Sequence, residues 1–299
     1  MDTPSLLSAF RAHGSLVRIG GHQLFVSDYA ATSSGAAPDS PPLLFLHGFP
    51  TSSFDYARLL PLLSAHRLIL FDFLGYGYSD KPRPHSYSLF EQAALAEAVA
   101  EHLGVREVIL VAHDMGSSVA LVLLQRARLA VAGLVLLNGS LLLTHYRPLI
   151  SQRALLHPIL GPLLTGLGLI RKAVFTRQFS RLFPTPPPAD ELDAFWSLIA
   201  HNEGPAIYDR LIQYLNERKQ HELAWLAALV AHQAPLLILW GQRDPVAVPA
   251  IGESIAARRP DARYVKLPAL GHYPQWEDPQ TIAEEIRRFC QSAAAPVSA

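Results

Sequence analysis

Three side chains that could break a covalent bond each follow a short apolar run of the sequence. They are Asp114 in Ala-His-Asp-Met-Gly, Asp244 in Gly-Gln-Arg-Asp-Pro and His272 in Leu-Gly-His-Tyr-Pro. An aspartate, whose ordinary pKa is about 3.9, is ionised at neutral pH and attacks a saturated carbon without the help of a base. Attack on an amide would give an anhydride, so a carboxylate favours alkyl transfer. We therefore predict an ester on Asp114, hydrolysed by water that His272 activates while Asp244 orients the imidazole.

Backbone N–H groups beside the nucleophile are needed to hold the oxyanion that forms when this ester is hydrolysed. Phe49 follows another apolar run, in His47-Gly48-Phe49-Pro50, and Met115 follows the nucleophile itself. The sequence therefore predicts an oxyanion hole formed by the N–H groups of Phe49 and Met115.

Each of these residues also has a structural interpretation. Asp114 could cap the helix that follows it, and Asp244 could be a turn residue before a proline. The order nucleophile, acid, histidine at three strand ends favours the catalytic interpretation. Asn138 follows a fourth strand but, as an amide, cannot replace the acid, and we expect structural roles for His47 and His113. The two serines after the turn fall inside the predicted helix and are poor nucleophiles.

The runs that precede these groups are typical of buried strands separated by helices. Two N-terminal runs, 17–19 and 23–26, are predicted to pair around Gly20-Gly21-His22. Further strands are predicted at residues 42–46, 68–71, 108–112, 134–137, 236–240 and 264–267, with helices at 89–103, 117–126 and 279–289 among those between and after them. This alternation predicts an α/β fold with a doubly wound, mostly parallel sheet and active groups at the strand C-termini.

Residues 140–226 interrupt the alternation, because they contain helical patterns rich in Leu, Pro and His and no strand pattern. We predict a helical cap over 140–226, inserted between a first core part at 1–139 and a second core part at 227–299. Cap residues would then form much of the substrate pocket.

Composition limits the partners that we expect. With 25 acidic and 25 basic residues, the overall charge indicates neither nucleic acid nor an anionic membrane surface. A single cysteine, Cys290, fits a reducing compartment, and no secretory signal or apolar run of about 20 residues is present, so we expect a cytoplasmic protein without a transmembrane segment. The 13 histidines lack metal-ligand spacing, so we expect no metal, and no cofactor is predicted. The sequence does not specify an oligomeric state.

Longer motifs carry a family resemblance. They are His47-Gly-Phe-Pro-Thr-Ser-Ser, Asp72-Phe-Leu-Gly-Tyr-Gly-Tyr-Ser-Asp-Lys-Pro-Arg-Pro-His, Ser88-x-Phe-Glu-Gln-Ala, His113-Asp-Met-Gly, Arg147-Pro-Leu, Gln213-Tyr-Leu-Asn-Glu-Arg-Lys and Gly271-His-Tyr-Pro-Gln-Trp-Glu-Asp-Pro. The chain resembles the α/β-hydrolases, in the aspartate-nucleophile branch of epoxide hydrolases and haloalkane dehalogenases. Within that branch it is similar to the mesoderm-specific transcript group. The resemblance implies an α/β-hydrolase fold with an inserted cap.

The leaving group distinguishes the activities that this resemblance implies. Epoxide hydrolases protonate the epoxide oxygen with cap tyrosines, and Tyr214 lies where one of them is expected; Tyr146 and Tyr208 are candidates for the second. Dehalogenases need N–H donors aimed at a halide, but the side chains of Met115 and Phe49 cannot donate. We therefore expect an epoxide hydrolase that acts on small apolar epoxides with water. The alternatives are a haloalkane dehalogenase or ester hydrolase with the same triad, or a ligand-binding or scaffold protein with little turnover.

Overall fold

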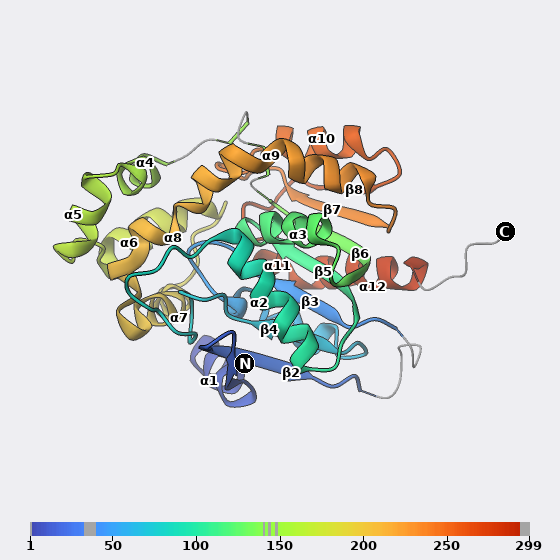
Figure 1. Cartoon of the computed structure of the whole chain (residues 1–299), viewed down its shortest axis with the longest axis horizontal. Coiled ribbons are helices and arrows are strands. Elements are labelled where there is room, and N and C mark those ends of the chain that lie inside the picture. Colours follow the sequence, from blue (N-terminus) through green and yellow to red (C-terminus); the bar gives the residue numbers. More distant parts are fainter. Residues whose placement is uncertain (1, 33–39, 140, 143–144, 147–148, 294–299) are drawn as a thin grey trace.

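An eight-stranded sheet forms the centre of the protein in the computed structural model, which describes residues 2–32, 40–139, 141–142, 145–146 and 149–293 (Figure 1). Its strand order is β1-β2-β4-β3-β5-β6-β7-β8. The strands are β1 (Ser15–Ile19), β2 (His22–Tyr29), β3 (Leu43–Leu46), β4 (Leu68–Phe71), β5 (Glu107–His113), β6 (Ala130–Leu137), β7 (Leu236–Gly241) and β8 (Arg263–Leu267). β2 is antiparallel to both β1 and β4, and the other pairs are parallel. The predicted α/β fold with a mostly parallel sheet is confirmed.

The central strands are short apolar runs because both faces of the sheet are covered. Every residue of β3, β4 and β7 is buried, and these strands consist mainly of Leu, Ile and Phe. β1, at the edge, leaves most of its residues partly or fully exposed. In the pairing of β3 with β5, Leu46 lies opposite Ala112. β3 and β5 therefore end next to each other, which brings the segment at Phe49 next to Asp114.

Helices pack on both sides of this sheet. α2 (Leu89–His102), α3 (Met115–Arg126) and α9 (Tyr214–Ala231) lie in front of it in Figure 1, where α3 packs against both α2 and α9. α12 (Pro279–Ala293) contacts β6 and β7. The remaining elements are α1 (Thr3–His13), α10 (Pro249–Arg258), α11 (Pro274–Glu277) and the 3₁₀ helices η1 (Ser53–Tyr56), η2 (Leu60–Leu62), η3 (Ser180–Leu182) and η4 (His201–Ile207). The pattern did not predict α1 and α10.

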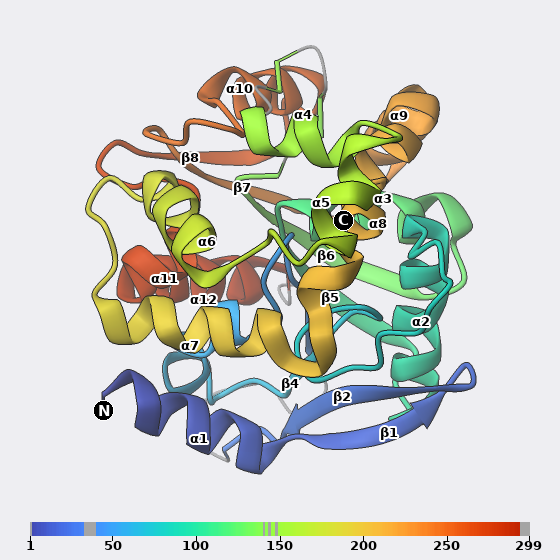
Figure 2. The same ribbon diagram turned by 90° about the vertical axis from the view of Figure 1, so that its left-hand side faces the viewer.

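A group of helices joins β6 to β7 and contains no strand among its described residues. It begins with α4 (Ile150–Leu156), α5 (Leu160–Gly166), α6 (Lys172–Phe179), α7 (Ala189–Ala200) and α8 (Tyr208–Leu211), which we call the helical insert. The insert gathers at one end of the sheet, away from the C-terminus in Figure 1, and Figure 2 looks onto it. The predicted cap boundary at residues 226 and 227 falls within α9, and Arg147-Pro148 of the family motif lies outside the described residues. No described helix is both long and apolar enough to cross a bilayer.

Candidate active site

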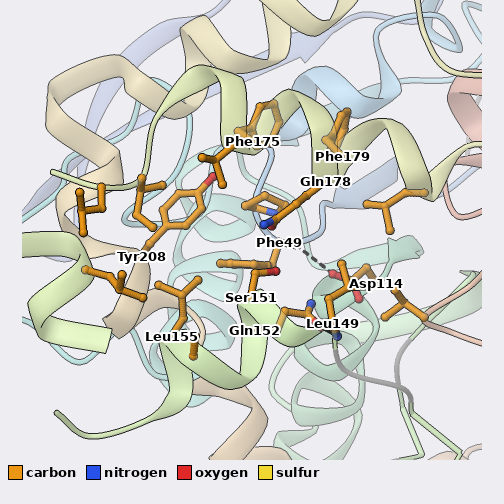
Figure 3. A pocket seen from close by; sticks show the side chains of 18 of the residues that line it. Phe49, Asp114, Leu149, Ser151, Gln152, Leu155, Phe175, Gln178, Phe179 and Tyr208 are labelled. Carbon is orange, nitrogen blue, oxygen red and sulfur yellow. Dashed lines mark hydrogen bonds between the residues drawn. The ribbon is translucent and has the colours of Figure 1, made fainter. Parts of the chain in front are cut away.

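Asp114 occupies a sharp turn between β5 and α3. Its backbone has φ 45° and ψ −115°, a conformation that an L-residue adopts only at a cost. The side chain makes no capping hydrogen bond to α3. Instead Oδ2 accepts the N–H of Phe49 at 3.1 Å, and the carboxylate lines a cavity (Figure 3). The alternative interpretation of Asp114 as a helix cap therefore does not describe this side chain.

Two glycines permit the close approach of the segments around this turn. A Cβ atom on Gly48 would lie 2.8 Å from the Cβ of Asp114. A Cβ on Gly116 would lie 2.1 Å from the backbone oxygen of Leu46. Any larger residue at either position would push the β3 segment away from the turn, and with it the N–H of Phe49.

His272 and Asp244 form a buried hydrogen-bonded pair at the ends of β8 and β7. The Nδ1–H of His272 donates to Oδ2 of Asp244 at 2.6 Å. Oδ1 of Asp244 accepts the backbone N–H groups of Val246 and Ala247 at 2.8 and 2.9 Å. The carboxylate is thus fixed by its own loop, and it fixes the imidazole in turn. His272 lines the same cavity as Asp114.

Asn138 has a role that the sequence did not reveal. Its Nδ2–H donates to Oδ2 of Asp244 at 2.8 Å, and its Oδ1 accepts the N–H of Gly241 at 2.8 Å. Asn138 itself sits at the end of β6 with φ 37°. Asn138 therefore orients the carboxylate of Asp244, which follows the neighbouring strand β7.

The electrostatic environment of His272 depends on both carboxylates. Burial alone would lower its pKa, because it removes the imidazolium from water. The charge and hydrogen bond of Asp244, and then the charge of Asp114, outweigh burial and raise the pKa of His272 to about 9. The imidazole is therefore protonated at neutral pH. Loss of the charge on Asp114 would remove one of the causes that hold this proton.

Two further buried histidines brace the loops of the site. Burial lowers the pKa of His47 to about 3, so it is neutral. Its Nε2 accepts the N–H of Phe73 at 2.9 Å, and its Nδ1–H donates to the oxygen of Gly48 at 2.9 Å. Burial, followed by the charge of His272, lowers the pKa of His113 to about 4, and its Nε2 contacts the backbone oxygen of His272 at 2.7 Å. Both contacts are consistent with the structural roles that we expected.

The other residues near the turn lie as follows. Met115 is the first residue of α3, so its N–H is one of those that have no acceptor within the helix. Ser117 and Ser118 are fully buried inside α3. The hydroxyl of Ser117 donates to the oxygen of Ala112 at 3.3 Å, and that of Ser118 accepts the Nε–H of Arg218 at 3.0 Å.

The cavity beside Asp114 has a volume of about 230 Å³ and mainly apolar walls. In Figure 3, Phe175, Gln178 and Phe179 of α6 face Ser151, Gln152 and Leu155 of α4 across it. The sequence did not reveal Gln152 and Gln178, although Gln178 interrupts an otherwise apolar face of α6. Oε1 of Gln152 accepts the hydroxyl of Tyr146 at 2.7 Å and the N–H of Leu149 at 2.8 Å. The amide N–H₂ of Gln152 is thus the group that remains for other partners.

The three candidate tyrosines differ in their surroundings. Tyr208 lines the cavity, its ring lies 5.5 Å from that of Phe49, and its buried hydroxyl has no hydrogen-bond partner among the described residues. The ring of Tyr214 lies 5.9 Å from that of Phe49. Burial first and the charge of Asp114 second raise the pKa of Tyr214, so its hydroxyl senses the carboxylate. The hydroxyl of Tyr146 is engaged with Gln152.

One set of possible metal ligands lies away from this site. Within the described part of the chain, ligand atoms of His22, His85 and Glu91 lie within 4.8 Å of one another. Nε2 of His85 is 2.7 Å from Oε2 of Glu91, so a hydrogen bond already links two of the three. Sequence spacing could not reveal this set, because the fold alone brings β2 near α2.

Comparisons with known proteins agree with this architecture. The family model described as alpha/beta hydrolase fold matches residues 41–279. LipZ of Mycobacterium tuberculosis is 43% identical over 258 residues, which cover 82% of this chain and 87% of that protein. The mesoderm-specific transcript protein of Mus musculus is 36% identical over 301 residues, covering 96% and 88%. The predicted resemblance to this group is confirmed.

A solved structure extends the likeness to three dimensions. The crystal structure of the haloalkane dehalogenase DbeA from Bradyrhizobium elkani has a TM-score of 0.79 to this chain at 26% sequence identity. The match covers 94% of this chain and 98% of that chain. The helical insert and the sheet are therefore both part of the shared fold.

Proposed function

The chain belongs to the α/β-hydrolase fold family, and we propose that it hydrolyses small apolar molecules, epoxides first among them, through an ester on Asp114. The proposal rests on one arrangement. A carboxylate on a strained turn accepts the N–H of Phe49 at 3.1 Å and shares a cavity with His272, which Asp244 holds at 2.6 Å. In this proposal the helical insert acts as the cap that encloses the substrate.

In the first step a carboxylate oxygen of Asp114 attacks a carbon of the epoxide. The carbon–oxygen bond of the ring breaks, and its electron pair stays on the leaving oxygen, which takes a proton. We assign the donor to Tyr214, the tyrosine that the family resemblance favours, which is buried with its ring 5.9 Å from that of Phe49. Tyr208, the one candidate tyrosine among the described lining residues of the cavity, is the second candidate, whereas Tyr146 already donates to Gln152. Acid catalysis of this kind contributes roughly 10²–10⁴-fold.

In the second step water attacks the ester carbonyl, and His272 accepts a proton from it. Esterification removes the negative charge of Asp114, which is one of the causes that raise the pKa of His272. The pKa of His272 therefore falls once the ester has formed, and the imidazolium returns a proton to the phenolate that the first step left on the donor tyrosine. The neutral imidazole can then act as a base. The N–H groups of Phe49 and Met115 stabilise the oxyanion. Collapse of the tetrahedral intermediate restores Asp114 and releases a diol.

A carbon–halogen bond is the second candidate for the cleaved bond. The amides of Gln152 and Gln178 face the cavity and offer N–H donors that the residues beside the nucleophile lack. The DbeA structure with which this chain shares its fold is a haloalkane dehalogenase. In that reaction the same ester forms, and the halide leaves without a proton.

A single turnover in water labelled with heavy oxygen tests the ester route. The enzyme is mixed with a smaller amount of an aryl-substituted epoxide, and the peptide that contains Asp114 is analysed by mass spectrometry. Label in Asp114 is expected, because water attacks the carbonyl carbon of the ester and one of the two oxygens of the restored carboxylate comes from water. Label found only in the diol, at every epoxide and haloalkane that is turned over, would contradict the proposal.

The variant His272→Gln provides the complementary measurement. Without the base the ester cannot be hydrolysed, so the intact protein should gain the mass of one substrate molecule. His113→Gln serves as the matched control, since His113 braces the loop but does not line the cavity. It should accumulate no adduct.

A further inference from the structure

The helical insert exposes an apolar surface that the proposed reaction does not use. Seven of the ten large apolar side chains that are exposed among the described residues lie between residues 150 and 174. We call them the insert surface: Ile150, Ile159, Leu160, Leu163, Leu167, Leu169 and Val174. Ile150 is 87% exposed, Ile159 74% and Leu167 62%. An apolar cluster of this kind on a water-soluble surface indicates a site of interaction.

The segment that carries the insert surface contains charged side chains of one sign only. Residues 149–189 contain five cations and no Asp or Glu: Arg153, Arg171, Lys172, Arg177 and Arg181. Lys172 pairs with Asp193 at 2.7 Å, but within the described part of the chain the four arginines, all of them exposed, form no ion pair. The balanced charge of the whole chain, from which we expected no affinity for an anionic membrane, thus averages segment 149–189, with five cations and no Asp or Glu, with a remainder of 20 cations and 25 acidic residues.

The cavity that contains Asp114 extends to the insert surface. Leu169 and Val174 belong to the insert surface, and both also line the cavity that contains Asp114. A neighbouring hollow is lined by Val174, Arg177, Gln178 and Arg181. α4, α5 and α6, which supply these residues, lie together at the end of the molecule that Figure 2 shows from the front.

We propose that the insert surface docks onto the surface of an anionic phospholipid bilayer. Short helices with exposed Leu and Ile can enter the boundary between headgroups and acyl chains, while flanking arginines bind lipid phosphates. A symmetric contact between two copies of this chain would instead bring the arginines of both copies together without any acid to pair with them. A bilayer provides acyl chains for the apolar side chains and phosphates for the cations.

Docking of this kind would also place the exposed residues of the cavity wall, Leu169 and Val174, against the lipid. Apolar molecules concentrate in the lipid, and from there they could pass between Leu169 and Val174 to Asp114 without crossing water. This second statement rests on the proposed function, whereas docking itself does not require turnover. The variant Asp114→Asn should therefore bind vesicles as the unchanged protein does.

Co-sedimentation with sucrose-loaded vesicles tests the proposal on the full chain. Vesicles of phosphatidylcholine with phosphatidylglycerol are compared with vesicles of phosphatidylcholine alone. We expect strong binding to the first, weaker binding to the second, and a decrease in binding as salt is added. Arg171→Glu combined with Arg177→Glu should weaken binding by at least roughly 30-fold, since each cation near the surface contributes about a factor of five to six.

Matched variants distinguish the contribution of the insert surface to vesicle binding from a general effect of substitution on the protein. Ile159→Ser with Leu167→Ser should weaken binding, whereas Leu223→Ser, which changes an 83% exposed leucine of α9, should not. Arg106→Glu with Arg128→Glu, at exposed positions near the opposite end of β5, is the control for charge. Equal binding to both kinds of vesicle, or binding that survives both pairs of substitutions, would overturn the proposal. So would a dimer that Ile159→Ser with Leu167→Ser dissociates, without binding to vesicles.

Discussion

The strand ends and the helical insert hold their side chains in opposite ways. At the strand ends, Asp114, Asp244 and His272 are at most 4% exposed. Backbone N–H groups bind both carboxylates, and a carboxylate binds the imidazole. In the insert, short helices form an apolar wall of the cavity and expose several leucine side chains to solvent. The first region is fixed by the sheet, and the second mainly by contacts between side chains.

This difference separates the reaction from the choice of substrate. Groups that the backbone positions within the sheet can perform one kind of chemistry for many substrates. In the proposed reaction, the walls formed by α4 and α6 determine which molecule fits and which leaving group meets a hydrogen-bond donor. Substitutions at the strand ends should therefore stop all turnover, whereas substitutions in the insert or at its junction with α9 should change it for some substrates only.

The largest effect is expected for Asp114→Asn. Without the carboxylate no ester forms, and turnover of epoxides and haloalkanes alike should fall by at least about 10⁴-fold. Steady-state rates with both substrate classes measure this. Ser117→Ala is the matched control, because this serine lies three residues after Asp114 in α3 and is buried. Equal losses in the two variants would remove the distinction that we draw between the aspartate and the serine.

The sequence predicted the strands that precede Asp114, Asp244 and His272, because each strand depends on local chemistry. Apolar runs determine where the strands lie along the sequence. A residue that follows a parallel strand then lies at the carboxyl edge of the sheet. The order of Asp114, Asp244 and His272 then suggests their roles. The orienting role of Asn138 was not predicted, because it depends on the parallel pairing of β6 with β7.

The insert was predicted only as a set of helices, because its function depends on packing across the cavity. Whether Gln152 and Gln178 face the substrate follows from how α4 and α6 lie relative to each other, which no periodicity encodes. The same holds for the tyrosines: Tyr208 lines the cavity, while Tyr146 turns to Gln152. The basic character of residues 149–189 was present in the sequence, but the balanced total charge concealed it.

The next largest effect should depend on the leaving group. Tyr214→Phe should slow epoxide opening by roughly 10²–10⁴-fold, because the leaving oxygen loses its proton donor, and should leave halide release nearly unchanged. Burst kinetics with one substrate of each class measure the first step. Tyr208→Phe is the control, and a larger loss in this variant than in Tyr214→Phe would transfer the role of donor to Tyr208.

A smaller effect is expected at a strand end that does not touch the substrate. Asn138→Ala removes the hydrogen bond to Oδ2 of Asp244, and a hydrogen bond to a charged group is worth about 1.5–3 kcal/mol. Hydrolysis of the ester should therefore slow roughly 10- to 100-fold, while formation of the ester continues. Rapid-quench detection of the ester separates the two steps. Equal slowing of both steps would mean that the variant disturbs the whole sheet edge and not the acid alone.

The smallest effect concerns the proton on His272, which links Asp114 to the pair at β7 and β8. The pKa of His272 is raised to about 9, partly by the charge of Asp114, so Asp114→Asn should lower it. A raised pKa stabilises the fold fully below the ordinary value of about 6.5, and this stabilisation is lost as the pH rises through about 9. The difference in unfolding free energy between the unchanged protein and Asp114→Asn should therefore decrease from pH 6.5 to 9, as urea unfolding would show.

Lys81, whose pKa burial lowers to about 8, titrates in the same range but cancels in this difference, because Asp114 is not among the charges that act on it. An NMR titration of the His272 ring gives the pKa directly, and an identical midpoint in both proteins would mean that Asp114 does not control the proton that the second step requires.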